Sequence, residues 1–314
     1  MNKQILIDLV GKRPSENWLI RRARFHQGWW RALILNEEQG SNPGKKDDPV
    51  CNTIYSGEIS GKNFLTPAAI AAIHETKEER KAYEAGLFNE DRLFNNLLSS
   101  QPLAFNFFGE LKQDTVLARK VFSAFIPQLS KVTNVFFEFA PKEKFTGDNS
   151  AFDVAIEFEK DGLKGILGLE CKYTDSFSKK EYDREAYKSV FSKSGAFSQP
   201  YENYINSRFN QLFRGQLIAE ALVQNEKYNL AYTGLFCFHE DSEALETGRQ
   251  FQSMLNDGKN IFKIITYADF IAAIQKLDLT WEQREWSMLL WSRYCGMKLS
   301  EGLFDFGKKA NTAP

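Results

Sequence analysis

The stretch AFDVAIEFEKDGLKGILGLECKYT, residues 151–174, decides the fold that this sequence predicts. It predicts two β-strands, 151–160 and 165–174, joined by turn residues around Asp161 and Gly162. Alternation of side chains along the first strand places Phe152 and Val154 on one face and Asp153 on the other. The two strands therefore predict a hairpin with one buried face and one face that carries charge.

The same alternation places Glu170 and Lys172 on one side of the second strand. If the two strands pair through the Asp161-Gly162 turn, Asp153 and Glu170 converge while both strands stay rooted in the core. Two carboxylates beside an ammonium group predict a site for a divalent cation, and hard oxygen ligands favour Mg²⁺, with Mn²⁺ as a substitute. The carbonyl of Cys171 is a further candidate ligand.

Outward from the hairpin, the sequence alternates between helical and strand patterns. A strand is predicted at 132–141, and helices are predicted over 66–100, broken near Gly86, and over 114–127, with Asp114 as the N-cap. Downstream, the predicted elements are a helix at 200–224, strands at 230–239 and 261–267, and terminal helices. This order predicts an α/β fold with a mixed central sheet flanked by helices on both faces.

Residues 13–39 predict a helical segment with an aromatic and basic cluster that includes Arg22, Trp30 and Arg31. Either the arginines lie along a phosphate backbone, or the aromatic side chains pack on a core while the arginines face water, and we favour the second interpretation. The predicted domains are a helical N-terminal arm or cap at 1–66, a core at 67–276 and a helical C-terminal extension with a tail at 277–314.

Composition excludes several classes of protein. The 314 residues carry a formal charge of −1, so no bulk electrostatic signal indicates a polyanionic partner. The four cysteines, Cys51, Cys171, Cys237 and Cys295, lack CxxC spacing, which argues against zinc and disulfides and predicts buried thiols. No signal peptide, membrane span or phosphate-binding loop is present, so we expect a cytoplasmic protein with no membrane partner and no nucleotide cofactor.

The spacing D-x16-E-x-K resembles the PD-(D/E)XK nuclease superfamily, although Phe152 stands where the family name has proline. The chain is most similar to a bacterial group of predicted restriction endonucleases, over about residues 15–270. The stretches that carry this likeness are LLSSQPLAFNFFG (97–109), FEFAP (137–141), FDVAIEF (152–158), LGLECKYTDSF (167–177) and QLFRGQLIAEAL (211–222). The resemblance implies a restriction-endonuclease-like fold with an additional helical N-terminal region.

The same resemblance implies that Asp153, Glu170 and Lys172 are catalytic, with Gln211 and Arg214 on the following helix near the substrate. It also implies a helical acid, best matched by Glu90, with Glu110 as the alternative. The sequence leaves open whether Glu138 extends the acidic cluster or is a solvated glutamate at the edge of the sheet. It also leaves open whether the polar connection with Lys179 and Lys180 contacts a nucleic-acid backbone or is an ordinary solvated helix.

The function implied is hydrolysis of phosphodiester bonds in DNA by a Mg²⁺-dependent nuclease of the restriction or defence type. Lys172 would orient the attacking water or stabilise developing charge. Two alternatives stay open: a nuclease-fold subunit that binds DNA or a partner without cutting, and a structure-selective exonuclease or junction resolvase. Cutting both strands of a duplex would favour a homodimer with two-fold symmetry.

Overall fold

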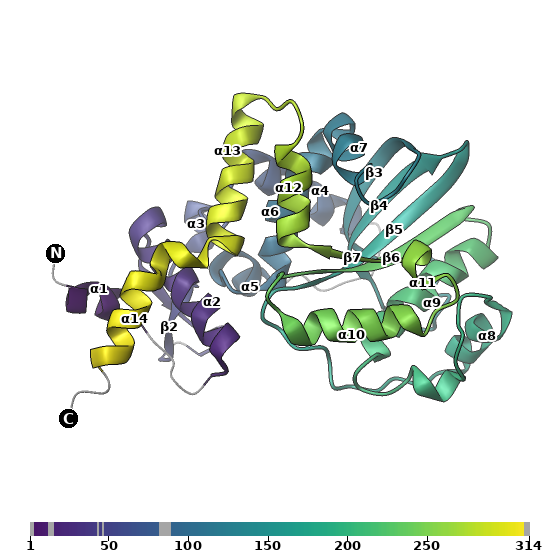
Figure 1. Ribbon diagram of the computed structural model, residues 1–314, viewed down its shortest axis with the longest axis horizontal. Helices are drawn as coiled ribbons and strands as arrows, with labels where there is room; N and C mark the ends of the chain where they lie inside the picture. The colour runs from purple at the N-terminus through teal and green to yellow at the C-terminus, as the bar shows by residue number, and fades with distance from the viewer. Residues whose placement is uncertain (1–2, 12–15, 43, 46, 82–88, 311–314) are drawn as a thin grey trace.

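A five-stranded sheet lies at the centre of the computed structural model, which describes residues 3–11, 16–42, 44–45, 47–81 and 89–310 (Figure 1). Strands β3 (Leu129–Phe139), β4 (Phe152–Lys160) and β5 (Leu163–Lys172) form an antiparallel meander. Strands β6 (Leu230–Cys237) and β7 (Phe262–Thr266) continue the sheet parallel to β5. The predicted mixed sheet is confirmed.

The turn between β4 and β5 explains the tight pairing of these strands. Asp161 and Gly162 both have positive φ angles, 53° and 77°, as a two-residue hairpin loop requires. Glycine adopts this conformation without steric cost, and aspartate tolerates it better than most residues. The loop fixes a register in which Lys160 faces Leu163 and Val154 faces Leu169.

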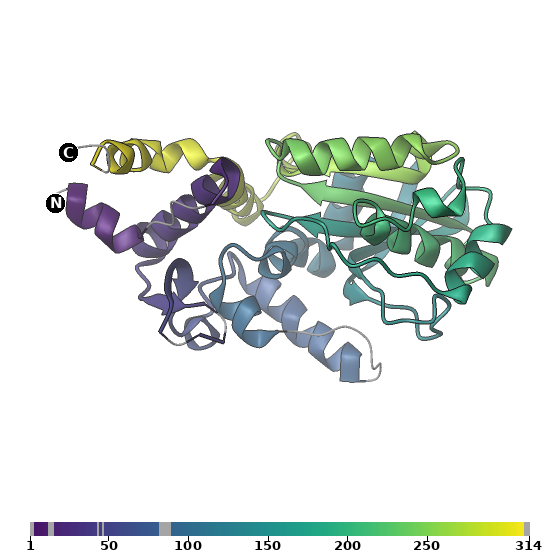
Figure 2. The same cartoon turned by 90° about the horizontal axis from the view of Figure 1, so that it is seen from below.

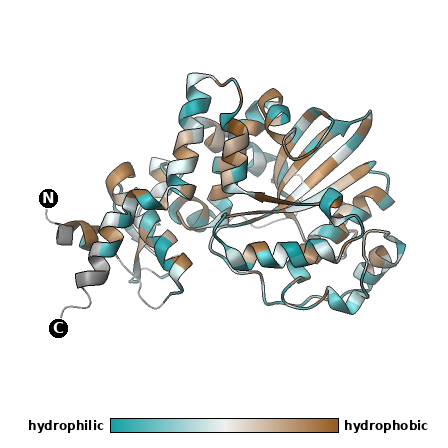
Figure 3. Ribbon diagram, in the orientation of Figure 1, coloured by the Kyte–Doolittle hydropathy of each residue, from teal (hydrophilic) through white to brown (hydrophobic). Residues whose placement is uncertain are grey.

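Helices cover both faces of the sheet. The larger hydrophobic core lies on one face, beneath α6 (Ser100–Gln113), α7 (Thr115–Phe122), α12 (Tyr267–Gln275) and α13 (Trp281–Leu290). Helices α8 (Glu185–Lys193), α9 (Asn210–Gln224) and α10 (Ser242–Ser253) pack on the other face. Figure 1 shows the sheet between these two layers, and Figure 2 views the layer of α8, α9 and α10 from its outer side. In Figure 3 hydrophobic residues are frequent in the strands, and the helices carry both hydrophobic and hydrophilic residues.

Several boundaries differ from those predicted. The N-cap at Asp114 is confirmed, because its side chain accepts a hydrogen bond from the Leu117 amide at 2.8 Å, but the helix ends at Phe122. The helix predicted from residue 200 begins at Asn210, after the short 3₁₀ turn Tyr201–Asn203. Helices α6, α8 and α10 were not predicted as separate elements. Gly86, the predicted break in an earlier helix, lies outside the described residues.

The elements before the sheet are mainly helical; the first of them lie at the end of the molecule where both chain ends are marked, and the later ones lie closer to the sheet (Figure 1). They are α1 (Lys3–Val10), α2 (Trp18–Trp29), a π-helix (Trp30–Leu35), β1 (Gln39–Ser41), β2 (Pro49–Ile54), α3 (Gly57–Ser60), α4 (Pro67–Lys81) and α5 (Glu90–Asn95). Helix α4 packs closely on α6, where a Cβ on Gly109 would lie 2.6 Å from Ala69 Cα. Strands β1 and β2 pair in a separate two-stranded antiparallel sheet.

The short helix α11 (Gly258–Ile261) lies beside the sheet, directly before β7. The last elements, a second π-helix (Trp291–Cys295), a 3₁₀ turn (Met297–Ser300) and α14 (Glu301–Ala310), return to the N-terminal end of the molecule, where α14 packs against α1. The larger core is one cluster of buried side chains whose members range in sequence from Ala23 to Met297. The predicted domain boundaries after residues 66 and 276 stay predictions.

The arginines of the N-terminal segment correct one prediction. Trp30 is buried as expected, but Arg22 and Arg31 are also buried, with only 4% and 1% of their surface exposed, and do not face water. Arg22 donates to Ser300 Oγ at 2.9 Å, and Arg31 donates to the Cys51 carbonyl at 2.8 Å. These guanidinium groups replace water with backbone and hydroxyl acceptors, so they hold the N-terminal elements together.

The cysteine prediction is confirmed for Cys51, Cys171 and Cys237, which are buried thiols outside any disulfide, whereas the Cys295 thiol is half-buried. Among the helices that the structure describes, none combines the length and hydropathy needed to cross a bilayer.

Candidate active site

Three carboxylates lie in one row across neighbouring strands. The register that pairs Phe137 with Val154 and Phe139 with Phe152 places Glu138 of β3 beside Asp153 of β4. The register that pairs Val154 with Leu169, continued by one residue, places Asp153 across from Glu170 of β5. The convergence of Asp153 and Glu170 predicted from the hairpin is present, and Glu138 adds a third carboxylate. We call Glu138, Asp153 and Glu170 the acidic row.

Side-chain alternation breaks at this row in both β3 and β4. Phe137 and Val154 face the larger core, whereas Phe139 and Phe152 face the opposite side, beneath α9. Glu138 has a φ of 50°, a left-handed conformation that is uncommon for a residue other than glycine. The placement of Phe152 on the same face as Val154 was therefore wrong, because the strand turns over at Asp153. Irregularities of this kind re-aim side chains beside active sites.

Asp153 is anchored by the backbone of the next strand. Its Oδ2 atom accepts a hydrogen bond from the Cys171 amide at 2.7 Å. Burial, then the negative charges of Glu170 and Glu138, raise the pKa of Asp153 well above its usual value. The Cys171 side chain lies in the core, and burial raises the pKa of its thiol, so the side chain stays neutral and structural.

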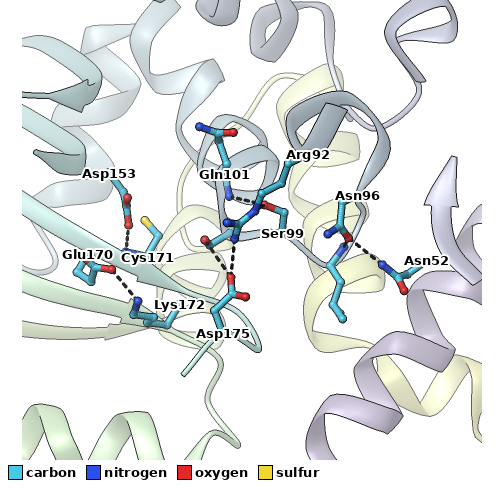
Figure 4. A network of polar contacts seen from close by, with 12 residues as sticks. Asn52, Arg92, Asn96, Ser99, Gln101, Asp153, Glu170, Cys171, Lys172 and Asp175 are labelled. Atoms are coloured by element: carbon cyan, nitrogen blue, oxygen red, sulfur yellow. Dashed lines mark hydrogen bonds and ion pairs between the residues drawn. The ribbon is translucent and has the colours of Figure 1, made fainter. Parts of the chain in front are cut away.

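Lys172, Glu170 and Gln211 form a closed triangle of polar contacts. Lys172 Nζ lies 2.9 Å from Glu170 Oε1 and donates to Gln211 Oε1 at 2.9 Å. Gln211 Nε2, from the first turn of α9, donates to the same Glu170 oxygen at 2.6 Å. Figure 4 shows Lys172 turned toward Glu170 at the end of β5. The triangle fixes both charged groups relative to one another.

The charge of Lys172 is preserved despite burial. Only 6% of its surface is exposed, and burial alone would lower its pKa, but the charge and hydrogen bond of Glu170 outweigh this and raise the pKa. The Phe177 ring lies 5.1 Å from Nζ, and Tyr267 Oη donates to the Lys172 carbonyl. Lys172 is therefore a rigid, permanently protonated cation at neutral pH.

A second set of contacts ties the end of β5 to the helices that precede the sheet. Arg92 of α5 donates to Asp175 Oδ2 at 2.9 Å and to Ser99 Oγ at 2.7 Å (Figure 4). Gln101, near the start of α6, donates to Glu138 Oε1 at 3.0 Å. Burial raises the pKa of Glu138; the Gln101 hydrogen bond opposes this increase. These contacts hold the outer end of the acidic row.

The donor set fits a divalent cation. Within the described residues, no three His, Cys, Asp or Glu side chains form a ready-made metal-binding group. A magnesium site, however, typically needs only one or two carboxylates and keeps several waters. In the part of the chain that the structure describes, the hydrogen bonds to Asp153 use Oδ2 and the contacts to Glu170 use Oε1. Oδ1 and Oε2 thus remain for a cation, which would also relieve the repulsion between these carboxylates.

Other predicted site residues lie outside this cluster. Glu90 is exposed at the start of α5 and pairs with Lys77 at 2.7 Å, and none of its described contacts reaches the acidic row. Arg214 donates to Ser150 Oγ at 2.9 Å and lies 3.7 Å from Asp148 Oδ2, so it braces the loop before β4. Their proposed roles stay predictions.

Lys179 and Lys180 are exposed in the segment between β5 and α8, which is irregular at these two positions. Their contact with nucleic acid also stays a prediction. The sequence left Glu138 open and did not identify its partner Gln101. The signal available was a single acidic residue within the apolar run FFEF, directly before the strand end.

Comparison with known proteins agrees with this geometry. A family model described as the PD-(D/E)XK nuclease superfamily matches residues 14–296, nearly the whole chain. No curated protein and no solved structure matches. The matched span contains the acidic row, Lys172 and the mixed sheet with helices on both faces, which confirms the expected restriction-endonuclease-like fold. The chain therefore belongs to the PD-(D/E)XK nuclease superfamily.

Proposed function

We propose that this protein is a metal-dependent deoxyribonuclease that hydrolyses phosphodiester bonds, and that it acts as an endonuclease of the restriction or defence type. The observation that supports this most directly is the contact of Lys172 Nζ with Glu170 Oε1 at 2.9 Å, beside Asp153. A subunit that only binds DNA has no physical need for buried like charges held together, because their mutual repulsion destabilises the fold.

In this proposal Asp153 and Glu170, with the carbonyl of Cys171, hold Mg²⁺ or Mn²⁺. The bound ion would polarise a phosphoryl oxygen and lower the pKa of a water molecule. Lys172 keeps its proton at neutral pH because its pKa is raised, so it acts as a cation and hydrogen-bond donor and not as a general base. It orients the attacking water or stabilises charge on the phosphate.

Gln211 has a positioning role in the same scheme. Its amide nitrogen binds Glu170, while its oxygen accepts from Lys172 and from the Ser178 amide at 3.2 Å. A single side chain therefore sets the direction of one proposed metal ligand and of the ammonium group. Arg214, Lys179 and Lys180 are proposed contacts to the DNA backbone.

The test is cleavage of duplex, single-stranded, branched and methylated DNA with Mg²⁺ or Mn²⁺. We expect the wild type to cut at least one substrate and Lys172→Met to lose at least about 100-fold in rate, the scale for removal of one charge-stabilising donor. Lys120→Met is the matched control, because Lys120 is exposed on α7, on the face of the sheet opposite α9.

The outcomes separate the candidate functions. Cutting of duplex DNA by the wild type and the control supports the endonuclease. Cutting confined to branched DNA or to strand ends would indicate a resolvase or an exonuclease. If all three proteins bind DNA equally and leave every substrate intact with either metal, the protein is a binding subunit and the proposal fails.

A further inference from the structure

A cavity of about 380 Å³ opens along the edge strand β3, between the end of α4 and the end of α9, and Glu138 of the acidic row is part of its wall. Its apolar lining includes Phe136 and Phe139 from β3, with Leu222 and Tyr228 from the end of α9 and the residues after it. We propose that this cavity receives one unpaired nucleobase of the DNA strand that lies on the acidic row. The inference rests on the proposed function and extends it to the form in which the substrate is bound.

The irregularity at Glu138 builds the aromatic wall of this cavity. In a regular strand Phe136 and Phe139, three positions apart, would face opposite sides of the sheet. Because the chain turns over at Glu138, both rings lie on the α9 side, with their centroids 5.4 Å apart. The left-handed conformation of Glu138 thus directs its carboxylate into the acidic row and also brings the rings of Phe136 and Phe139 together beside the row.

Size and lining favour a single base over a larger ligand. The volume lies near the lower end of the range for small-molecule sites, about 300–1,000 Å³, and cannot contain a duplex. Aromatic rings bind any nucleobase by stacking, because every base has a π face. A base must leave its helical stack to enter such a cavity, as it does in enzymes that extrude a nucleotide into a pocket.

Charged side chains of both signs line the cavity, and the cations Arg80, Lys142, Lys164 and Lys227 outnumber the carboxylates Glu79, Glu138 and Glu143. Lys142, Lys164 and Lys227 are exposed, where they can meet a nucleotide backbone. Lys227 pairs with Glu143 and Lys164 with Glu157, at 2.9 and 2.8 Å. The Lys227–Glu143 pair is exposed on both sides and contributes little, so Lys227 can exchange its carboxylate for a phosphate at small cost, whereas Glu157 is only 18% exposed and also accepts from Tyr228.

The cavity meets the acidic row at Glu138, which lines it, whereas Asp153 and Glu170 do not. Asp153 lies across from Glu138 on β4, so a base in the cavity would place its own phosphate near the row. The Glu138 carboxylate is an acceptor suited to an exocyclic amino group of a base. The same residue therefore links the position of the base to the position of the backbone.

The test compares two DNA duplexes that differ at one central position. One carries an unpaired extra nucleotide and the other carries an abasic residue at the same place, and binding is measured by fluorescence anisotropy with the Lys172→Met protein and Mg²⁺, so that cleavage does not interfere. We expect the duplex with the base to bind at least about tenfold more tightly, as expected for stacking of one base.

Phe139→Leu and Phe136→Leu should each bring this ratio close to one. Phe145→Leu is the matched control, because Phe145 is half-buried on the same side of the sheet but does not line the cavity. Equal binding of the two duplexes by the Lys172→Met protein would overturn the inference. The inference would also be overturned if Phe139→Leu and Phe136→Leu both kept the same ratio of affinities for the two duplexes. Base-independent binding would point to a different occupant, such as a peptide.

Failure of the proposed nuclease function and failure of the cavity assignment would give different results. A wild-type protein that cuts no substrate but distinguishes base from abasic residue would retain the cavity assignment and lose the nuclease assignment. A wild-type protein that cuts DNA but shows no such distinction would do the reverse.

Discussion

Two regions of this molecule hold buried charged side chains in different environments. At the end formed by the N-terminal and C-terminal helices, Arg293 is fully buried and donates to Asn63 and Gln27 at 2.6 to 3.1 Å. In the acidic row, like charges face one another and the pKa values of Asp153 and Glu138 are raised. Charges satisfied by neutral dipoles stabilise a fold, whereas crowded like charges indicate a reactive site.

The largest expected effect on stability comes from the satisfied region. Arg293→Met would leave Asn63 Oδ1 and Gln27 Oε1 without their donor, whereas the Asn63 carbonyl keeps its hydrogen bond from Asn106. Each buried acceptor without a donor costs about 1–3 kcal/mol, so we expect the free energy of unfolding to fall by at least about 2 kcal/mol. Urea denaturation followed by circular dichroism measures it.

The control for this change is Arg284→Met. Arg284 is 55% exposed and lies 3.9 Å from the fully exposed Asp278, so its loss should change the free energy of unfolding by less than about 1 kcal/mol. If both variants unfold at the same urea concentration as the wild type, the buried guanidinium does not have the structural role assigned to it.

An effect of intermediate size is expected from substitution of Gln211, and it should lower activity more than stability. Gln211→Ala removes the bonds to Glu170 and Lys172, and loss of a residue that orients a metal ligand typically costs about 10- to 100-fold in activity or metal affinity. Single-turnover cleavage rates and Mn²⁺ affinity measure it. Gln224→Ala, at the other end of α9, removes one bond to the Val190 carbonyl and should leave both unchanged; equal losses in the two variants would reject the positioning role.

The smallest effect is a pH dependence of stability in the protein without metal. The pKa of Asp153 is raised in the folded state, so folding favours its protonated form. Its contribution is therefore fully present below about pH 3.8 and is lost as the pH rises through the folded-state pKa. Asp153→Asn should flatten this decline, measured by urea denaturation between pH 4 and 8.

Glu159→Gln, an exposed carboxylate on the same strand, is the comparison for this measurement. It should leave the pH dependence as in the wild type. A variant Asp153→Asn with the full wild-type decline would mean that the crowding of the acidic row has no energetic consequence.

The sequence predicted the sheet and most of the site because these depend on local alternation. The hairpin at Asp161 and Gly162 and the convergence of Asp153 with Glu170 follow from residue spacing alone. The reversal at Glu138 does not, because FFEF alternates normally in sequence and the left-handed φ of Glu138 depends on tertiary contacts, including the bond from Gln101.

Two other differences between the predicted and the observed structure have separate causes. Helix α10 carried a usable signal, with buried Ala244 and Phe251 two turns apart and Asp241 as its N-cap, and it was overlooked. The burial of Arg22 was not predictable from its neighbours, because its acceptor Ser300 lies 278 residues further along the chain. Local pattern predicts elements, whereas the partners of buried polar groups depend on the assembled fold.

The contact between Arg22 and Ser300 also has a consequence for biosynthesis. At about 5–20 residues per second, a ribosome needs roughly 14–56 s to add the 278 residues between them. During that interval the Arg22 guanidinium lacks its final acceptor, and the helix that carries it cannot complete its packing. The strands that carry Asp153, Glu170 and Lys172 are synthesised before Ser300, so the helices that follow them join a sheet whose strands already exist, and the packing around Arg22 is completed only after residue 300 has been added.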